Sequence, residues 1–358
     1  MFKKFRLNSS TPDFLAIGDI ATDAFIRLKD ASVHCKLNRE DCELCLRFAD
    51  KVPFEFVEVV KAVGNAANAA VSASRLGLST AFMTDIGGDQ EGRECIDELK
   101  KNKISVQYVT KHKNKKTNYH YVLWFEDERT ILIKHEDYDY KFHAPRKAPR
   151  WVYLSSLGAN SLAYQLQIAD WLKTHNEINF AFQPGTFQIS AGMEKLEPFY
   201  RLAHVFFCNV EEAERILKTA GGGYVADAAN SEFPDTKIKN LLMAMHKLGP
   251  KIVVITDGPC GAYAFDSQAA NGAGEMWFMP PYPDPKPPYE RTGAGDAFAS
   301  TFTAALALGK NVSEALQWGP INSMSVVQYV GAQKGLLGRR QIEEFLAKAP
   351  ADYKPRRI

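Results

Sequence analysis

The sequence predicts an α/β fold in which helices cover both faces of a doubly wound, mainly parallel sheet, with a small β-sheet lid attached. Two observations carry this prediction. From residue 150 onward short apolar runs alternate with helical segments, and the run at 251–256 is almost continuously apolar, as in strands buried on both faces. Near the C-terminus, a Gly-Ala-Gly turn at 293–295 opens a long run of small and apolar residues, which is typical of a buried helix.

The composition is that of an ordinary globular protein, and it limits the classes of function. Of 358 residues, 46% are apolar and 24% are charged, and the formal net charge is only +2. This balance gives no electrostatic reason to expect nucleic acid or a membrane as a partner. The first ten residues are polar and basic, without the apolar core of a signal peptide, so we expect a cytoplasmic protein whose six cysteines are free thiols.

The first expected strand, 14–20, ends in an acidic residue, Asp19, and a second acid, Asp23, follows just beyond it. Ligands of open α/β sheets bind beyond the carboxyl ends of the strands. Asp23 is therefore a candidate for binding the hydroxyl groups of a substrate. The alternative is that Asp23 is a solvated acid in a turn.

A helix is expected to open in 63–71 and to run to Leu76, with small residues that allow close packing. Gly64 lets a ligand approach the backbone at its start, and Asn68 lies one turn later, within reach of the same ligand. Asn68 can equally be a hydrogen-bonding residue of the helix start. The next expected elements are strand 80–86, helix 90–102 with Asp89 as its N-cap, and strand 106–110.

Two segments differ in character from this alternation and are expected to form the lid. Residues 30–59 are charged and end in an alternating run, and 117–125 is expected to pair with 130–135 as a hairpin. Such a lid can cover the substrate or join two copies of the chain as a homodimer. The predicted division gives the core residues 1–29, 60–115 and 136–358, and the lid residues 30–59 and 116–135.

The second half of the chain is expected to supply the remaining parallel strands and their right-handed crossover helices. The expected strands are 151–154, 178–182, 204–208 and 251–256, and the expected helices are 162–174, 210–219 and 237–248.

The turn Gly293-Ala294-Gly295 and the carboxylate of Asp296 are the strongest candidates for chemistry. A glycine turn at a helix N-terminus can aim several backbone N–H groups at one point, and the helix dipole adds positive charge there. Asp296 stands in the first turn of the same helix, beside this anion site. An anion hole next to a base is the arrangement that phosphoryl transfer to a hydroxyl group needs.

Two further motifs at strand ends fit nucleotide chemistry. Asn209 and Glu212 fall on one face of a helix start and can orient a hydrated magnesium ion, although the same pair is common as a purely structural N-cap. The loop from Thr256 through Gly258 to Gly261 can hold a phosphate or nucleoside against its backbone, or it can be a simple hairpin turn.

The cysteines of the expected lid segment 30–59 offer a different kind of site. Cys35, Cys42 and Cys45 are closely spaced, and His34 adjoins the first of them. A structural zinc ion needs about four such ligands, so zinc is an alternative to free thiols here.

On these motifs the chain resembles the ribokinase-like (PfkB) family of carbohydrate and nucleoside kinases, over nearly its whole length. Residues 292–298, Thr-Gly-Ala-Gly-Asp-Ala-Phe, resemble the C-terminal signature of that family. Residues 64–77 with Gly87-Gly88-Asp89 are similar to its N-terminal signature, and Asn209 with Glu212 is similar to its Asn-x-x-Glu motif.

The resemblance implies an ATP- and Mg²⁺-dependent kinase with a β lid that often dimerises. It implies Asp296 as the base for the acceptor hydroxyl and the backbone of 293–295 as the anion hole. The other implied roles are acceptor binding by Asp23, Gly64 and Asn68, magnesium and phosphate binding by Asn209 and Glu212, nucleotide binding by Thr256, Gly258 and Gly261, and lining of the adenine pocket by Asn322.

The chain departs from the family pattern at two places. Val63 stands where the family has the first glycine of a pair, and Glu290-Arg291 stands where it often has Asp-Thr. The family acid commonly helps to bind a monovalent cation, so activation by K⁺ stays open, and Arg291 can fill part of that electrostatic role.

We expect the acceptor to be a small sugar. The first alternative is a nucleoside kinase, in which Tyr119, Tyr121 or Trp124 of the lid stacks on a base. The second alternative is a non-catalytic sensor of sugars or nucleotides built on a kinase fold.

Overall fold

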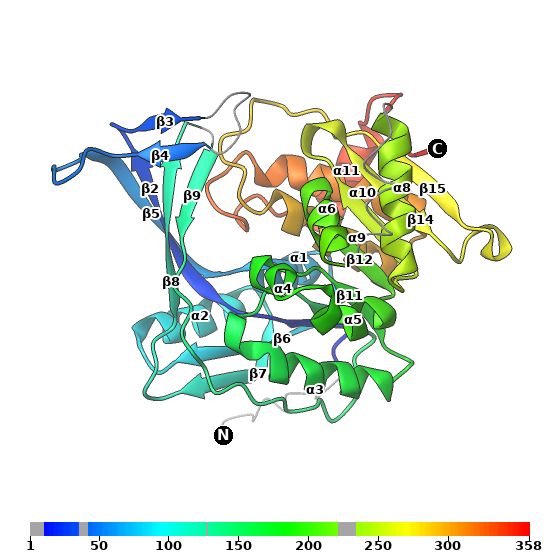
Figure 1. The fold of residues 1–358 in the computed structure, drawn as a ribbon, viewed down its shortest axis with the longest axis horizontal. Helices are drawn as coiled ribbons and strands as arrows, with labels where there is room; N and C mark the ends of the chain where they lie inside the picture. Colours follow the sequence, from blue (N-terminus) through cyan, green and yellow to red (C-terminus); the bar gives the residue numbers. More distant parts are fainter. Residues whose placement is uncertain (1–10, 36–41, 127, 221–233) are drawn as a thin grey trace, which may run out of the picture.

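The computed structural model describes residues 11–35, 42–126, 128–220 and 234–358, and it confirms the α/β class expected from the sequence (Figure 1). A ten-stranded sheet forms the body. Its parallel strands are, in spatial order, β13 (Ile252–Thr256), β12 (Val205–Asn209), β11 (Asn179–Phe182), β10 (Trp151–Leu154), β1 (Phe14–Ile17), β6 (Thr80–Gly87) and β7 (Ser105–His112). Three antiparallel strands continue it beyond β13: β14 (Ala262–Asp266), β15 (Glu275–Met279) and β16 (Arg356–Arg357).

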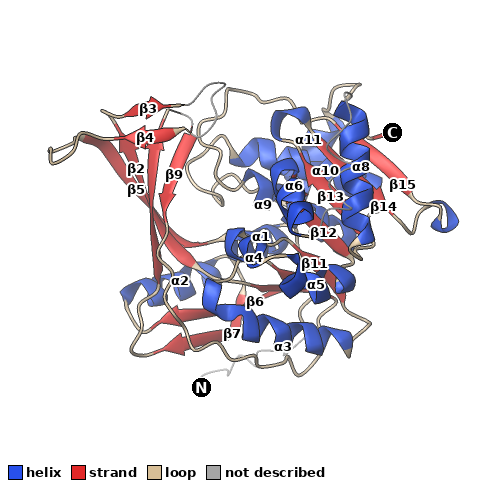
Figure 2. Cartoon of the chain, in the orientation of Figure 1, coloured by secondary structure: helices blue, strands red, loops and turns tan. Residues whose placement is uncertain are grey.

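Helices cover both faces of this sheet, because successive side chains of each strand point to opposite faces (Figure 2). In β1, Phe14 and Ala16 belong to one apolar core, while Leu15 and Ile17 belong to the other. The first core contains α1 (Asn65–Arg75), α2 (Gln90–Lys101), α9 (Ala294–Ala307), α10 (Val312–Val326) and α11 (Arg339–Ala347). The second contains α3 (Leu162–Lys173), α4 (Thr186–Ala191), α5 (Met193–Leu202), α6 (Val210–Thr219) and α8 (Pro234–Lys247).

A second sheet stands at one side of the body and is the lid (Figure 1). Its four strands lie in the order β5 (Phe54–Val63), β2 (Ala21–Leu28), β8 (Asn118–Phe125) and β9 (Glu128–Leu132). A short hairpin of β3 (Ser32–His34) and β4 (Glu43–Cys45) extends this region. Single turns of 3₁₀ helix occur at η2 (Ala159–Ser161), η3 (Gly258–Cys260) and η4 (Ala270–Gly272).

The structure corrects the expected boundary between core and lid. The core was expected to include residues 1–29 and 60–115, but β2 lies in the lid sheet, where it pairs with β5 and β8, and β5 runs on to Val63. The physical reason is that β1 ends at Ile17, and the chain turns at 18–20 before β2 begins. The pattern of apolar and polar residues in the sequence does not by itself distinguish the end of β1 from the start of β2.

The expected hairpin of the lid is confirmed, with a shorter turn. Phe125 pairs with Glu128 and Trp124 with Arg129, so the first residues of β9 lie inside the ladder rather than in the loop. Trp124 is almost fully buried: Arg27 lies over its ring, and Phe56 and Tyr289 pack edge-on against it. Trp124 is therefore part of the lid core and not a surface on which a substrate base can stack.

The N-cap expected at Asp89 is confirmed. Its Oδ1 accepts hydrogen bonds from the backbone N–H of Gly92 (3.0 Å) and from Thr117 Oγ1 (2.7 Å). The same carboxylate thus stabilises the start of α2 and fixes the residue that precedes β8, where the chain enters the lid.

The expectation of free thiols is wrong for Cys35 and Cys42 and confirmed for Cys45, and the alternative of zinc at these three residues is corrected as well. Cys35 and Cys42 form a disulfide, while Cys45 carries a free thiol. A disulfide sulfur cannot act as a thiolate ligand of zinc. Among the described residues, no group of three or more His, Cys, Asp and Glu side chains is arranged to hold a metal ion.

In the described part of the chain, no helix has both the length and the apolar character that crossing a membrane requires.

Candidate active site

The anion-hole turn is built by the start of α9. Gly293 is the N-cap and adopts a left-handed conformation, with φ +82°, and a Cβ added to it would lie only 2.2 Å from Cβ of Ala332. Glu290, which precedes the turn, stabilises it: its Oε1 accepts a hydrogen bond from the backbone N–H of Thr292 (2.7 Å). The first N–H groups of a helix have no partner within it, so those of Gly295 and Asp296 are available to an anion.

Asp296 lies where elements far apart in the sequence meet. Asn68 Nδ2 donates a hydrogen bond to its Oδ2 (2.9 Å), and Gln183 Nε2 donates one to its Oδ1 (3.2 Å). The residue keeps some surface open to solvent, yet protein packs closely round the carboxylate, and this burial raises its pKa. Three contacts oppose this effect and lower the pKa: the hydrogen bonds from Asn68 and Gln183, and the charge of Arg129.

The partners of Asp296 are themselves fixed in orientation. Gln333 Nε2 donates hydrogen bonds to the carbonyl of Ala62 (2.7 Å) and to Oδ1 of Asn68 (3.0 Å). Tyr153 donates its hydroxyl hydrogen to Oε1 of Gln183. The amide N–H groups of Asn68 and Gln183 are thereby turned toward the carboxylate, so both side chains stabilise its charged form.

Gly64 lies at the start of α1 with φ +119°, and a Cβ added to it would lie 2.8 Å from the carbonyl oxygen of Asp19. The close approach that the sequence indicated is thus an approach to another backbone segment. Gly64 brings α1, and with it Asn68, against the end of β1.

Asp23 is buried on β2, and the parallel register with β8 sets it opposite His120. His120 Nδ1 lies 3.2 Å from Asp23 Oδ1, at ion-pair distance but without the geometry of a hydrogen bond. Oδ1 of Asp23 and Nε2 of His120 are both buried and have no hydrogen-bond partner in the described structure. Such atoms usually find partners, so this pair is a candidate for contact with a polar ligand.

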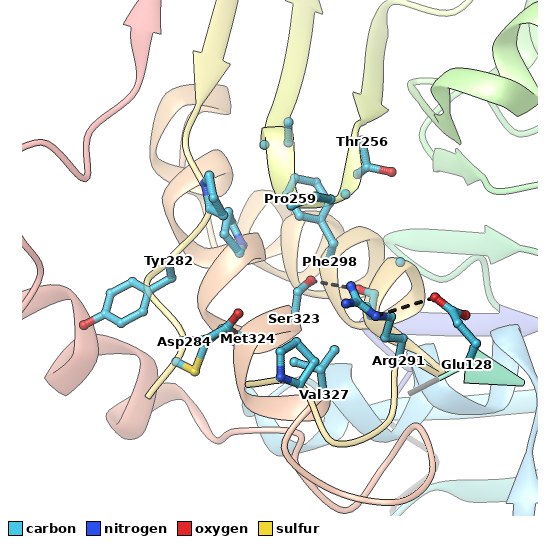
Figure 3. Close-up of a pocket in the computed structure, with 18 of the residues that line it drawn as sticks. Glu128, Thr256, Pro259, Tyr282, Asp284, Arg291, Phe298, Ser323, Met324 and Val327 are labelled. Atoms are coloured by element: carbon cyan, nitrogen blue, oxygen red, sulfur yellow. Dashed lines mark hydrogen bonds and ion pairs between the residues drawn. The ribbon is translucent and has the colours of Figure 1, made fainter. Parts of the chain in front are cut away.

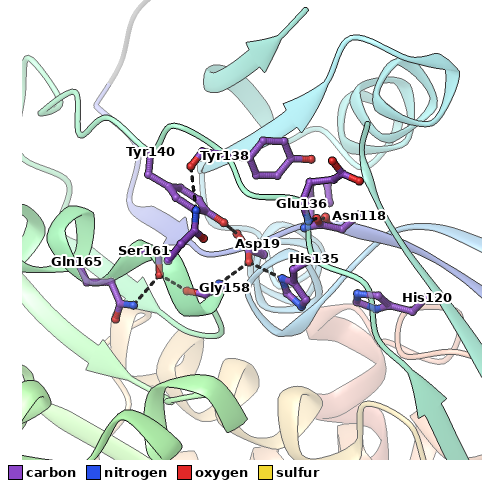
Figure 4. A network of polar contacts seen from close by, with 12 residues as sticks. Asp19, Asn118, His120, His135, Glu136, Tyr138, Tyr140, Gly158, Ser161 and Gln165 are labelled. Carbon is purple, nitrogen blue, oxygen red and sulfur yellow. Dashed lines mark hydrogen bonds and ion pairs between the residues drawn. The ribbon is translucent and has the colours of Figure 1, made fainter. Parts of the chain in front are cut away.

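Asp19 serves a structural purpose in a polar network that also reaches the neighbourhood of His120 (Figure 4). Its Oδ1 accepts a hydrogen bond from the Tyr140 hydroxyl (2.8 Å), and its Oδ2 accepts from the backbone N–H of Gly158 (2.7 Å) and from Nδ1 of His135 (3.0 Å). The ring of His135 packs against that of His120, with centroids 5.3 Å apart. The network fixes the segment that returns from the lid to the body, next to the pair of Asp23 and His120.

A cavity of about 370 Å³ lies against the start of α9 (Figure 3). Thr256, Gly258 and Gly261 line it, as expected for the nucleotide loop between β13 and β14. Its other walls come from Ala294 and Gly295, from the segment of Tyr282 and Asp284, from Ser323, Met324 and Val327, and from Glu128 and Arg129 of the lid. Its volume suits a bound nucleotide.

The structure corrects the role expected for Asn322. This side chain is fully buried, with Nδ2 donating to Thr301 Oγ1 (2.7 Å) and Oδ1 accepting from the backbone N–H of Leu337 (2.9 Å). It therefore packs α10 against α9 and does not line the cavity. Successive residues of a helix point about 100° apart, and it is the neighbouring Ser323 and Met324 that face the cavity.

Asn209 and Glu212 form a reciprocal capping box at the start of α6. Asn209 Oδ1 accepts from the backbone N–H of Glu212 (2.7 Å), and Glu212 Oε2 accepts from the backbone N–H of Asn209 (2.9 Å). The structural alternative is thus confirmed, and it leaves Oε1 of Glu212 outside the box. Burial raises the pKa of Glu212, and the charge of Asp296 is close enough to raise it further. Asn209 and Glu212 would hold a hydrated magnesium ion through its water molecules, and the ion would supply positive charge beside the phosphates of a nucleotide.

Four residues of the candidate site carried no assignment from the sequence: His120, Gln183, Gln333 and Arg129. Strand register could have indicated His120, because it lies opposite Asp23, but the pairing of β2 with β8 was not expected. Gln183 directly follows β11, at the strand ends where ligands gather, and this position was a usable signal.

Over most of its length the chain is similar to known kinases. The family model described as pfkB family carbohydrate kinase matches residues 41–337. The ribokinase of Bacillus subtilis is 26% identical over 293 residues, which are 79% of this chain and 87% of that protein. A nucleoside kinase of Methanothermobacter thermautotrophicus is 21% identical over 276 residues, 76% of this chain and 80% of that protein. A crystal structure of ribokinase from Cryptococcus neoformans in complex with ADP has the same fold, with a TM-score of 0.73 at 18% identity over 94% of this chain and 99% of that one.

Proposed function

We propose that this chain, which belongs to the pfkB family of carbohydrate kinases, transfers the γ-phosphoryl group of ATP to a hydroxyl group of a small sugar. The observation that carries the proposal is the place of Asp296. It directly follows Gly295, which lines the nucleotide cavity, and it accepts a hydrogen bond from Asn68, a residue expected to bind the acceptor. A base between a nucleotide site and a polar acceptor site is what the reaction requires.

In the proposed step the acceptor hydroxyl donates its proton to the carboxylate of Asp296 as its oxygen bonds to the γ-phosphorus. The bond from that phosphorus to the β,γ-bridging oxygen breaks, and ADP leaves with the electron pair. The N–H groups at the start of α9 stabilise negative charge on the moving group. Asn209 and Glu212 would hold a magnesium ion through water, and this ion would supply further positive charge to the phosphates.

A polar acceptor such as a sugar fits the residues around Asp296 better than a nucleoside does. Asp23, His120, Asn68 and Gln183 offer charged or amide groups to hydroxyls, and Asp23 and His120 have buried atoms in want of a partner. The aromatic residue with the largest stacking surface in the lid, Trp124, is buried within the lid itself. The nucleoside alternative then rests on Tyr119 and Tyr121, which pack against each other.

An acceptor screen tests the proposal. Release of ADP is followed with ribose, fructose, 2-keto-3-deoxygluconate, adenosine, cytidine and inosine, and products are identified by mass spectrometry. A sugar should give the highest kcat/KM, with a single phosphate added to it. Preferred phosphorylation of a nucleoside would replace the proposal by its alternative, and absence of any phosphorylated product would reject both.

Asp23→Asn is expected to raise KM for the acceptor about 10- to 100-fold, since a hydrogen bond to a charged group contributes about 1.5–3 kcal/mol. KM for ATP should stay within about twofold, because Asp23 is not among the residues that line the nucleotide cavity. Steady-state kinetics with each substrate varied in turn measures both values. The matched control is Asp50→Asn, an exposed acid of the lid, which should behave as the wild type. Equal changes in both KM values would contradict the assignment.

We also propose that the lid joins two copies of the chain. Phe54, Val57 and Val59 of edge strand β5 and Leu132 of the opposite edge strand β9 are apolar and about half exposed, and monomers rarely leave large apolar surfaces uncovered. The protein should therefore elute as a dimer in size-exclusion chromatography with light scattering, and Val59→Glu with Leu132→Glu should give a monomer. Leu166→Glu on α3, also an exposed apolar position, should leave the dimer intact. A monomeric wild-type protein at micromolar concentration would reject this interface.

A further inference from the structure

Arg129 belongs to the lid, yet it lines the nucleotide cavity together with Ala294 and Gly295 of the body. The antiparallel register of the hairpin sets this position, because Arg129 lies opposite the buried Trp124, which packs against Tyr289 of the body. A charged lid residue is thereby held at the edge of the anion-hole turn.

Glu290 connects Arg129 to that turn. Its side chain is fully buried, and its carboxylate accepts hydrogen bonds from the N–H and hydroxyl of Thr292 and from the N–H of Gly331 (3.3 Å). Arg129 Nε lies 3.8 Å from Glu290 Oε1. A buried carboxylate needs a positive countercharge, and within the described residues Arg129 is the cation found at ion-pair distance from it.

The contacts of Arg129 are nevertheless loose. Its Nε lies 3.8 Å from Oε1 of Glu290, and its Nη1 lies 3.9 Å from Oε2 of Glu128. Charge-assisted hydrogen bonds are shorter, about 2.7–2.9 Å. Its Nε is buried and has no hydrogen-bond partner among the residues that the structure describes. A guanidinium group has five donors in a planar fork, so this side chain has donors left for an anionic ligand in the cavity.

Resting on the proposed kinase activity, we propose that Arg129 is a catalytic residue, which brings a fixed positive charge from the lid to the phosphoryl group being transferred. The acceptor oxygen forms its bond to phosphorus as the bond to ADP breaks, and the guanidinium group binds oxygens of the moving group while charge spreads over them. Because Arg129 sits on the lid, this charge is complete only when the lid covers the site. Acceptor binding and phosphoryl transfer are thereby coupled.

The pair of Arg129 and Glu290 also bears on monovalent cations. A countercharge that belongs to the chain removes the need for a bound ion beside Glu290. We therefore expect the wild-type rate to agree within about twofold between K⁺ and tetramethylammonium at equal ionic strength. A rate that falls more than about tenfold without K⁺ would overturn this assignment, since an ion would then supply the charge.

The direct test is Arg129→Met. We expect kcat to fall about 10²- to 10³-fold with KM for the acceptor within about threefold, and Arg129→Lys to recover part of the loss because it keeps the charge. The matched control is Arg27→Met, which removes another arginine of the same sheet, one that lies over Trp124 and lines no part of the cavity. A comparable loss of kcat in the control would mean that any damage to the lid suffices, and would overturn the proposal.

A double variant separates catalysis from simple neutralisation of Glu290. If Arg129 only balances a buried charge, Arg129→Met with Glu290→Gln should regain kcat within about threefold of the wild type. If Arg129 acts on the phosphoryl group, the double variant should recover the Tm lost in the single variant but keep at least about a 100-fold lower kcat. This comparison also holds should Arg129→Met alone fold poorly.

A binding measurement keeps this test independent of the acceptor. By isothermal titration calorimetry, Arg129→Met should weaken binding of a non-hydrolysable ATP analogue about tenfold more than binding of ADP, because only the analogue carries the γ-phosphate. Equal weakening of both would overturn the role of Arg129 even in an active kinase. If Arg129→Met gave this difference while the wild-type protein phosphorylated no acceptor, the proposed function would be rejected instead.

Discussion

Asp296→Asn is expected to lower kcat with the true acceptor about 10²- to 10⁴-fold, which is the usual contribution of a positioned base. KM for ATP and for the acceptor should stay within about threefold, because asparagine has nearly the same shape and the cavity walls are unchanged. Proton transfer is the one function that the substitution removes outright. The result would appear in steady-state kinetics as a loss of kcat at saturating concentrations of both substrates.

The surroundings of Asp296 decide how stable that variant is. Asn68 and Gln183 both donate hydrogen bonds to the carboxylate, and an amide can accept only one of them, since its nitrogen would face the other donor. One hydrogen bond is lost, at about 1 kcal/mol, while removal of a buried charge acts in the stabilising direction. Tm should therefore change little, and a folded, inactive protein is the expected product.

Asp97→Asn is the matched control, because Asp97 is an exposed acid on α2, remote from the cavity. It should match the wild type in kcat and Tm. If Asp296→Asn kept near wild-type turnover while folded, the role of Asp296 as base would be wrong. If it lost activity only together with its fold, circular dichroism and thermal denaturation would reveal this.

The parts of the site that sequence reasoning located are those whose chemistry is local. The turn at 293–296 combines glycine conformation, helix start and carboxylate within four residues, and the structure has the helix start there as expected. Asp89 and the box of Asn209 and Glu212 are likewise set by contacts three residues apart along the chain. Such features depend on helix geometry alone, so the printed sequence contains them in full.

The parts that were missed depend on contacts between distant segments. His120 meets Asp23 only because β2 pairs with β8 across about a hundred residues, and nothing local distinguishes β2 from the strand before it. Arg129 was expected in the hairpin loop, but it pairs with Trp124 within the ladder. Likewise, only packing against α9 decides whether Asn322 or the next residue of α10 faces the cavity.

Gly293→Ala is expected to have the second large effect, on stability and activity together. Alanine at φ +82° costs about 1–2 kcal/mol. The new Cβ would also lie 2.2 Å from Cβ and 2.7 Å from Cα of Ala332, so backbone must move, and such overpacking costs about 1–3 kcal/mol more. We expect unfolding free energy to fall by about 2–5 kcal/mol in chemical denaturation.

Activity should fall further than stability alone explains, because the backbone that must move carries the N–H groups of the anion hole. Loss of one such donor costs about 10²- to 10³-fold in kcat, and that is the loss expected for the folded fraction. Gly309→Ala is the matched control: it follows α9 at a similar φ of +85°, but a Cβ there meets no atom within 4 Å. The control should lose only about 1–2 kcal/mol and keep its turnover. If the two variants proved alike in kcat, the turn at Gly293 would tolerate displacement, and the anion-hole assignment would be wrong.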